Sequence, residues 1–316
     1  MRKVLLASTA LVAMAGVNAA TADISFSGNS TFDYNAWSDS ATDNASQNNT
    51  STALATSITI KGSVVSDSGL SASVSQTLLN GDSDGHSMTL SDDWGSLSFD
   101  SGVGMGDDME TSADVALDEA TTAGTGAAFD GDSAVGAGSN SISYKTPSVN
   151  GFQASAGVAD AGAESKADTT SYGVSYKTEA AGAAITLKYA ASTTSANVDG
   201  GQDTKASSMG AVIAFGDVTV TLASNTKDSG TTKDYEGTGF GIAYAASDNL
   251  ALAAHSKSAE NDGVDDYDYS EAAVSANYTI ASGITAGVTY TDWDLTDNSG
   301  NKSDGTYTRV TVKVSF

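Results

Sequence analysis

The chain ends with Thr308-Arg309-Val310-Thr311-Val312-Lys313-Val314-Ser315-Phe316, in which polar and apolar residues alternate strictly up to the terminal phenylalanine. Successive side chains of a β-strand point to opposite faces of its sheet, so this stretch has one apolar face and one polar face. The same alternation returns at intervals along the whole chain. The sequence therefore predicts an all-β protein built from amphipathic strands.

The first 22 residues have the order of a secretory signal peptide. A basic start, Met1-Arg2-Lys3, is followed by fourteen mostly apolar residues at 4–17 and by the small residues Ala20-Thr21-Ala22. This order is typical of a cleaved export signal. A membrane-spanning helix needs about 20 apolar residues, and this apolar run is shorter. We predict cleavage after Ala22, with Ala19 as the alternative site, so that residues 1–22 are removed.

Cleavage leaves residues 23–316 as a single domain with a large negative charge. Loss of Arg2 and Lys3 reduces the 14 basic residues to 12, which against 39 acidic residues gives a formal charge of −27. Such a charge disfavours binding to nucleic acid or to an anionic lipid surface. The chain has no cysteine, which excludes disulfides and thiolate metal sites. One proline and 33 glycines suit many strands joined by turns, because proline cannot donate to a strand ladder.

The connections between the predicted strands alternate between short and long. Outer-membrane β-barrels have short periplasmic turns, longer external loops and an even number of strands, which matches this alternation. About 18 residues for each strand and its connection predict a closed, antiparallel, transmembrane β-barrel of sixteen strands. The short connections lie at 67–69, 92–95, 147–150, 179–182, 216–217, 247–249 and 281–283, and the long ones near 38–52, 80–86, 101–139, 159–169, 191–204, 225–235, 258–268 and 294–304.

The positions of the basic residues indicate which face of the strands meets lipid. A Lys or Arg on the lipid face near the membrane centre costs roughly 2–4 kcal/mol, so the polar face is predicted to line a water-filled lumen. Eight tyrosines fall on the apolar face, as in the aromatic girdles of such barrels, with Trp37 and Trp293 expected in the outer girdle and Trp94 in the inner one. The basic residues in the polar register are Lys61, Lys145, Lys177, Lys188, Lys257, Arg309 and Lys313, and the tyrosines are Tyr34, Tyr144, Tyr172, Tyr176, Tyr189, Tyr244, Tyr278 and Tyr290.

One connection, residues 102–138, is far longer and more acidic than the others. Loops longer than about 12–15 residues are usually functional or disordered. Residues 109–120 have the pattern of a short helix with a small apolar face that begins at Met109. We therefore expect this third external loop to fold into the lumen and narrow it, with a solvated external loop as the alternative. Its acidic residues are Asp107, Asp108, Glu110, Asp114, Asp118, Glu119, Asp130 and Asp132.

The chain resembles the general porins of alphaproteobacteria, in particular those of photosynthetic and marine members. The resemblance rests on Ile24-Ser25-Phe26-Ser27-Gly28-Asn29, on the long third loop and on the terminal Val314-Ser315-Phe316. It implies a homotrimer of sixteen-stranded barrels in the outer membrane of a Gram-negative bacterium, surrounded by outer-membrane lipid and lipopolysaccharide. It also implies that Phe316 is the signal read by the barrel-assembly machinery.

The resemblance further implies a constriction in which acidic residues of the third loop face a basic cluster on the wall. The basic partners would be Lys61 on the second strand and Arg309 and Lys313 on the last. The sequence departs from the family here, because Arg309 is the only arginine after residue 22. The acidic partners would be Asp107, Asp108, Glu110, Asp114, Asp118 and Glu119.

These features predict a pore for the passive diffusion of ions and small hydrophilic solutes. Three cations that face six or more carboxylates leave the constriction negative, and acidic rings select cations. The prediction therefore includes a preference for cations, and it requires no cofactor.

Two other functions stay open at this stage. A barrel hydrolase would draw on His86 or His255, the only histidines, and an adhesin or structural barrel would use its loops to bind a partner. Carboxylate oxygens are the ligands that Ca²⁺ prefers, so the third loop could hold a structural calcium near Asp107, Asp108, Asp130 and Asp132. The acidic segments 82–85, 262–271 and 297–304 do not have the EF-hand spacing.

Overall fold

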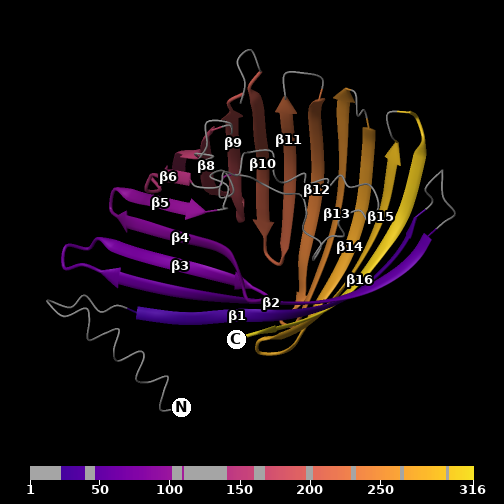
Figure 1. Cartoon of the computed structure of the whole chain (residues 1–316), viewed down its shortest axis with the longest axis horizontal. Coiled ribbons are helices and arrows are strands. Elements are labelled where there is room, and N and C mark those ends of the chain that lie inside the picture. The colour runs from indigo at the N-terminus through magenta and orange to yellow at the C-terminus, as the bar shows by residue number, and fades with distance from the viewer. Residues whose placement is uncertain are drawn as a thin grey trace.

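A computed structural model describes residues 23–39, 47–101, 109, 141–159, 168–196, 202–228, 233–263, 267–296 and 299–316. Sixteen antiparallel strands form one closed barrel, in which β1 pairs with both β2 and β16 (Figure 1). The predicted fold class and strand number are confirmed. The strands are β1 (Asp23–Asp39), β2 (Gln47–Val65), β3 (Ser71–Leu79), β4 (Asp82–Asp92), β5 (Gly95–Ser101), β6 (Ser141–Lys145), β7 (Phe152–Ala159), β8 (Thr169–Ala180), β9 (Ala183–Thr194), β10 (Thr204–Phe215), β11 (Val218–Asp228), β12 (Lys233–Ser247), β13 (Leu250–Gly263), β14 (Tyr267–Ala281), β15 (Ile284–Thr296) and β16 (Lys302–Ser315).

The two ends of the barrel sequence meet at one seam. The register of β1 against β16 runs from Asn29 opposite Ser315 to Asp39 opposite Gly305. Beyond the last strand, Gly28 and Phe316 exchange both backbone hydrogen bonds, each at 2.9 Å. The ladder therefore continues to the last residue of the chain, as the terminal alternation predicts.

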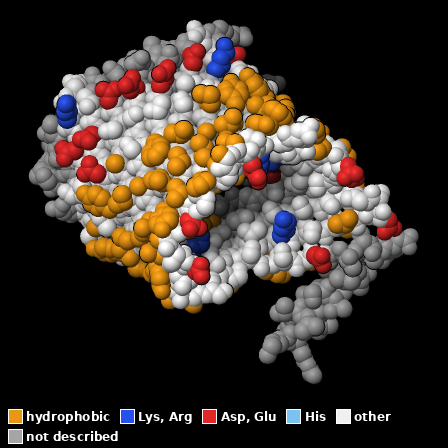
Figure 2. All heavy atoms as spheres, turned by 180° about the vertical axis from the view of Figure 1, so that it is seen from behind, with side chains coloured by type: hydrophobic (Ala, Val, Ile, Leu, Met, Phe, Trp, Pro, Cys, Tyr) orange, Lys and Arg blue, Asp and Glu red, His pale blue; other side chains and the backbone are white. Residues whose placement is uncertain are grey.

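The alternation of side chains separates a lipid-facing wall from a lumen wall. In β8, Ser171 and Ser175 are buried on one face, whereas Tyr172 and Val174 are exposed on the other by 57% and 48%. Large apolar and aromatic residues are exposed on strands from β1 to β16, and Figure 2 shows hydrophobic side chains gathered in a broad patch on the outer surface. This arrangement is that of a barrel with its apolar face turned to lipid.

The predicted tyrosines lie on the outer face, at different levels of the wall. The end of the barrel with the short turns and both chain ends is called here the short-turn end, and the opposite end the long-loop end. One group lies toward the short-turn end, where the Tyr144 ring stacks on Trp94 at 6.1 Å and its hydroxyl donates to the Trp94 carbonyl at 2.6 Å. Tyr34 and Tyr172 lie nearer the long-loop end, Tyr189 and Tyr290 lie near the middle of their strands, and those nearer the short-turn end are Tyr144, Tyr176, Tyr244 and Tyr278.

The prediction for Trp37 and Trp293 is wrong, because both lie on the lumen side. Trp293 is only 6% exposed and packs over Gly305, where a Cβ atom would lie 2.5 Å from its ring. Trp37 stands opposite the buried Tyr307 in the register of β1 with β16, and opposed residues share a face. The missing side chain at Gly305 therefore gives the indole of Trp293 its room inside the barrel.

The predicted short turns are confirmed, but three of the predicted long connections are short. Those expected near 225–235 and 258–268 leave only four and three residues between their strands, because the strands extend into these segments. All seven predicted short turns join consecutive strands as expected. The long connection expected near 80–86 is instead the two-residue turn Asn80-Gly81, with φ of 52° and 96°. Both values are positive, as a type I′ hairpin requires, and Asn-Gly is the sequence that best adopts it. The polar residues after Gly81 belong to β4, so polarity alone misidentified them as loop.

The height of the barrel wall is uneven. Strands β1 and β2 have 17 and 19 residues, whereas β5, β6 and β7 have 7, 5 and 8. The part of the chain that the structure describes contains no helix long and apolar enough to span a membrane.

Candidate functional site

A network of polar side chains lines the lumen at the seam between β1 and β16. Thr311 donates from its hydroxyl to Asp33 Oδ1 at 2.6 Å, and the Tyr307 hydroxyl donates to Asn35 Oδ1, also at 2.6 Å. Arg309 Nε donates to the same Asn35 oxygen at 3.1 Å and lies 3.9 Å from Asp33 Oδ1. The seam thus holds one carboxylate and one guanidinium side by side on the lumen wall.

The sequence places this network on the inner face by simple alternation. Tyr34 and Val310 are opposite each other on the outer face, both 42% exposed. Their neighbours Asp33, Asn35 and Arg309 therefore point inward. Pairing of the polar register of the first strand with that of the last follows from closure of the ring.

The three basic wall residues predicted from the sequence do not lie together. Arg309 is opposite Asn35 of β1, and Lys313 is opposite Thr31, four residues along the strand. Lys61 of β2 is opposite Ser25, six residues further toward the short-turn end. At about 3.4 Å per residue these steps are roughly 14 Å and 20 Å. The predicted cations are therefore spread along the wall, and Arg309 has an acidic neighbour in Asp33.

A second polar cluster, buried on the inner face of β13 and β14, was not expected from the sequence. Glu271 Oε1 lies 2.9 Å from His255 Nε2 and 3.2 Å from Lys257 Nζ. The Tyr269 hydroxyl donates to the other oxygen, Glu271 Oε2. All four residues are at most 6% exposed. The carboxylate thus accepts from three side chains, two of them on the neighbouring strand, and charge-assisted bonds of this kind are the strong ones.

Part of this cluster was visible in the sequence. Lys257 falls in the polar register as predicted, and His255 is one of two histidines considered for a hydrolase. Glu271 and Tyr269 share that register on the following strand, but only the register of β13 with β14 shows that Glu271 is opposite Lys257. The signal that was missed is a Lys and a Glu in the polar registers of consecutive strands.

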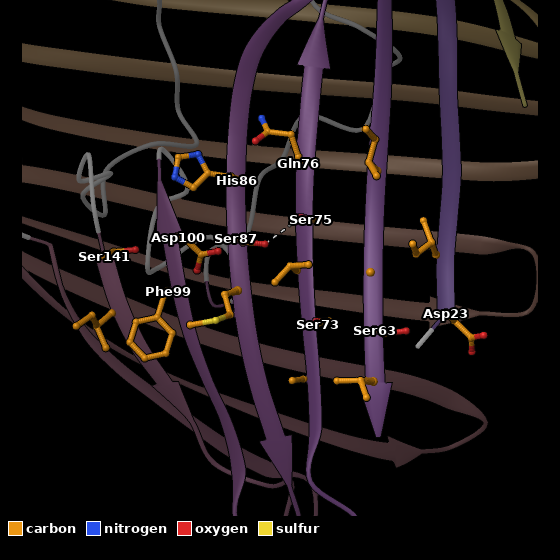
Figure 3. A pocket seen from close by; sticks show the side chains of 18 of the residues that line it. Asp23, Ser63, Ser73, Ser75, Gln76, His86, Ser87, Phe99, Asp100 and Ser141 are labelled. Carbon is orange, nitrogen blue, oxygen red and sulfur yellow. Dashed lines mark hydrogen bonds between the residues drawn. The ribbon is translucent and has the colours of Figure 1, made fainter. Parts of the chain in front are cut away.

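The other histidine lies on the opposite face of the wall. His86 of β4 is opposite Gln76 of β3, on the same face as the exposed Val74 and Met88. His86, Gln76, Val74 and Met88 border a hollow of about 1040 Å³ on the outer surface over β1 to β7 (Figure 3). Phe99 of β5, which is opposite Met88 in the ladder, also lines this hollow. His86 and His255 therefore lie on opposite faces of the wall and cannot belong to one catalytic site.

Met109 is the one residue between 102 and 138 that the structure describes, and it lies against the lumen wall. Its side chain is 1% exposed and packs with Ala190 of β9 and Ala206 of β10. A Cβ atom at Gly173 of β8 would come within 2.6 Å of Met109 Cβ. Gly173 and Ala190 are opposite each other on the inner face, so the contact spans three adjacent strands.

The predicted acidic site lies outside the described residues, as do the predicted signal peptide at 1–22 and the calcium ligands Asp130 and Asp132. Within the described ranges, no group of three or more His, Asp or Glu side chains could hold a metal ion. The predicted constriction residues that lie outside the described part of the chain are Asp107, Asp108, Glu110, Asp114, Asp118 and Glu119.

Comparisons with known proteins agree with this architecture. The family described as Gram-negative porin matches residues 7–314. No curated protein sequence matches the chain significantly. Among solved structures, OmpT of Vibrio cholerae superposes with a TM-score of 0.70 at 13% identity, over 95% of this chain and 99% of that one. The trimer form of OmpT superposes with a TM-score of 0.65 at 13% identity, over 94% of this chain and 100% of that one. An anion-selective porin from Comamonas acidovorans superposes with a TM-score of 0.65 at 15% identity, over 94% of this chain and 100% of that one.

Proposed function

The chain belongs to the Gram-negative porin family, and we propose that it forms a water-filled pore for passive diffusion of ions and small hydrophilic solutes. As a porin it resides in the outer membrane. The observation that carries the proposal is the closed sixteen-stranded barrel whose inner face is polar and whose outer face is apolar. The family and the fold point to a channel without enzymatic activity.

The third loop, residues 102–138, is proposed to enter the lumen and form the constriction. Met109 supports this proposal, because a residue of that loop is buried against inward-facing positions of β8, β9 and β10. Its neighbours in sequence, Asp107, Asp108 and Glu110, are then carried toward the pore. Residues 114–119 add three further carboxylates to the same loop.

The pore is proposed to prefer cations. The mature chain carries 39 acidic against 12 basic residues, once Arg2 and Lys3 are removed with the signal peptide. Of the three basic wall residues, Arg309 is beside Asp33, and Lys61 and Lys313 lie at other levels of the wall. Two unit charges 4 Å apart interact by about 1 kcal/mol in water, so several carboxylates could favour K⁺ over Cl⁻ several-fold. The likeness to an anion-selective porin, at 15% identity, concerns the fold alone.

The remaining parts of the proposal concern biogenesis and assembly. The mature start and the terminal Phe316 favour the alphaproteobacterial type of porin, assembled as a homotrimer, with a solved trimer among its structural neighbours. Phe316 is proposed as the signal read by the barrel-assembly machinery, and lipopolysaccharide as the lipid around the outer half of the barrel. Calcium held by Asp107, Asp108, Asp130 and Asp132 stays part of the proposal as a structural ion.

Planar-bilayer recording of the purified protein tests the pore and its selectivity together. Stepwise conductance with a cation-selective reversal potential across a KCl gradient, reduced when Glu110, Asp114 and Asp118 are neutralised, is the expected result. If the cation preference is unchanged in these variants, other residues of the pore determine its selectivity. Absence of conductance would refute the channel and favour an adhesin or structural barrel.

A further inference from the structure

Cations on the inner face of the wall differ in their surroundings. Arg309 Nε lies 3.9 Å from Asp33 Oδ1, and Lys257 Nζ lies 3.2 Å from Glu271 Oε1, so both of these cations have a carboxylate beside them. Three further inward-facing cations, Lys61, Lys177 and Lys313, are called here the mouth lysines. In the part of the chain that the structure describes, none of the three forms an ion pair.

The mouth lysines lie close to the short-turn end of the barrel. Lys61 precedes the last residue of β2 by four positions, Lys177 that of β8 by three, and Lys313 that of β16 by two. All three strands run toward the short-turn end, so at about 3.4 Å per residue each lysine lies within roughly 14 Å of the end of its strand. The short turns of outer-membrane barrels face the periplasm, which places these cations at the periplasmic opening.

The three side chains are exposed and surround the opening. Lys313 stands between Val312 and Val314, which are exposed on the outer face, so the lysine points into the lumen. In the ring of sixteen strands β8 is eight strands away from β16, and Lys177 is therefore across the lumen from Lys313. Lys61 lies on β2, two strands from β16.

The carboxylates of the described strands and turns at this end lie nearer to the rim than the lysines. Glu179 is two residues beyond Lys177 toward the short turn, and Asp23 is the first residue of β1. An ion that has passed the rim thus meets the lysines on the wall inside, where low-dielectric walls focus their field. The carboxylates in or beside the short turns are Asp67, Asp92, Asp93, Asp217 and Asp248.

We propose that the mouth lysines form a basic vestibule that draws small inorganic and carboxylate anions to the periplasmic opening. The inference rests on the proposed pore function and adds selectivity-determining residues to it. Because the vestibule lies at one end of the pore, its effect depends on the salt concentration at that end. The screening length is about 30 Å at 0.01 M salt but about 3 Å at 1 M. The vestibule therefore weakens the preference for cations most when the dilute solution is on the periplasmic side.

The test is the K⁺/Cl⁻ permeability ratio of single pores, taken from reversal potentials between about 0.01 M and about 1 M KCl with the gradient applied in both directions. A unit charge about 10 Å from an ion in water changes its local concentration roughly twofold, in opposite senses for K⁺ and Cl⁻. Lys313→Gln is expected to raise the lower of the two ratios about two- to fourfold. The triple variant Lys61→Gln, Lys177→Gln, Lys313→Gln should raise it further, while the ratio for the reversed gradient changes little because the lysines are then screened.

Charge can also be restored chemically, because the chain has no cysteine of its own. In Lys313→Cys, a positively charged methanethiosulfonate reagent should return the ratio to the wild-type value, and a negatively charged one should raise it further. Lys205→Gln is the matched control, since Lys205 is exposed on β10 four residues from the outward-facing Met209 and so shares the outer face. An unchanged ratio in the triple variant, or an equal shift in Lys205→Gln, would overturn the inference.

Heat-modifiable gel migration checks that each barrel is folded. Should the triple variant fail to fold, Lys313→Cys decides, because the two reagents are compared on the same folded pore. Equal ratios after both reagents would then refute the vestibule.

The same recordings separate the vestibule from the proposed function. Absence of conductance in the wild type would refute the pore and the vestibule together. Conductance with a ratio that no lysine variant shifts would refute the vestibule alone. A wild-type pore that prefers anions would contradict the proposed cation preference, whereas a rise of the ratio in the lysine variants would still support the vestibule.

Discussion

Removal of the Met109 side chain is expected to loosen the third loop from the lumen wall. Met109 is 1% exposed, and full burial of such a side chain is worth about 1.5–3 kcal/mol. A loss of about 2 kcal/mol lowers the ratio of docked to undocked loop by roughly thirtyfold, at 1.4 kcal/mol per factor of ten. Met109→Ala should therefore undock the loop for part of the time without unfolding the barrel, because none of the sixteen strands contains Met109.

A larger side chain on the wall, at Gly173, should displace Met109 and loosen the loop in the same way. A Cβ atom at Gly173 would lie 2.6 Å from Met109 Cβ and 2.7 Å from its Cγ. Gly173→Val cannot be accommodated unless Met109 moves. The two variants attack one contact from opposite sides, so a shared phenotype identifies the contact itself.

The assay is single-channel recording in 1 M KCl, where charge effects are screened and conductance reports the open cross-section. Both variants are expected to show a larger mean conductance and more frequent transitions between levels. Met209→Ala is the matched control, because Met209 of β10 faces outward and is 61% exposed. Conductance and noise equal to the wild type in both Met109→Ala and Gly173→Val would refute the docking of the loop through Met109.

Three other substitutions test separate parts of the structure. Glu271→Gln should lower the temperature at which the barrel unfolds in heat-modifiability gels, because it breaks the buried ion pair with Lys257 at a cost of about 3–5 kcal/mol. Asp268→Asn, an exposed change on the same strand, should not lower that temperature, and equal behaviour of the two variants would count against the ionic cluster. Phe316→Ala should reduce insertion into the outer membrane in cells while refolding in detergent stays unchanged, and equal losses in both assays would assign it a structural role only. Gly81→Ala, at φ 96°, should destabilise the β3–β4 turn by about 1–2 kcal/mol in urea unfolding, and an unchanged midpoint would contradict the type I′ turn.

Alternation in the sequence predicted the strands and their faces because a side chain on a strand has only two directions in which to point. The terminal run that ends in Phe316 belongs to this category, and so do the outward tyrosines. The hairpin at Asn80-Gly81 was missed because the polar residues that follow it look like a loop when only polarity is considered, although the dipeptide itself is a hairpin signal.

What alternation could not predict is the height of a residue on the wall and its partner across the ladder. Arg309 and Lys61 share the polar face, but the register places them ten residues apart when both are projected on β1. The pairing of Glu271 with Lys257 depends on register in the same way. The inward direction of Trp293, by contrast, does follow from alternation, because an odd spacing of three residues separates it from the outward-facing Tyr290 on the same strand. Only its contact with Gly305 depends on register.

The excess of acidic residues has a consequence for the solutes that the proposed pore would sort. A constriction with acids on one side and bases on the other has a field across the pore, which orients dipolar solutes. Because the 39 acidic residues of the chain outnumber the basic ones, the field of the proposed pore is expected to attract or repel solutes mainly by net charge instead. In liposome swelling, a cationic amino acid should therefore enter faster than an anionic one of similar size, while a zwitterion should match a neutral sugar of its size. A zwitterion that outpaces the sugar would indicate a transverse field and a basic wall elsewhere in the pore.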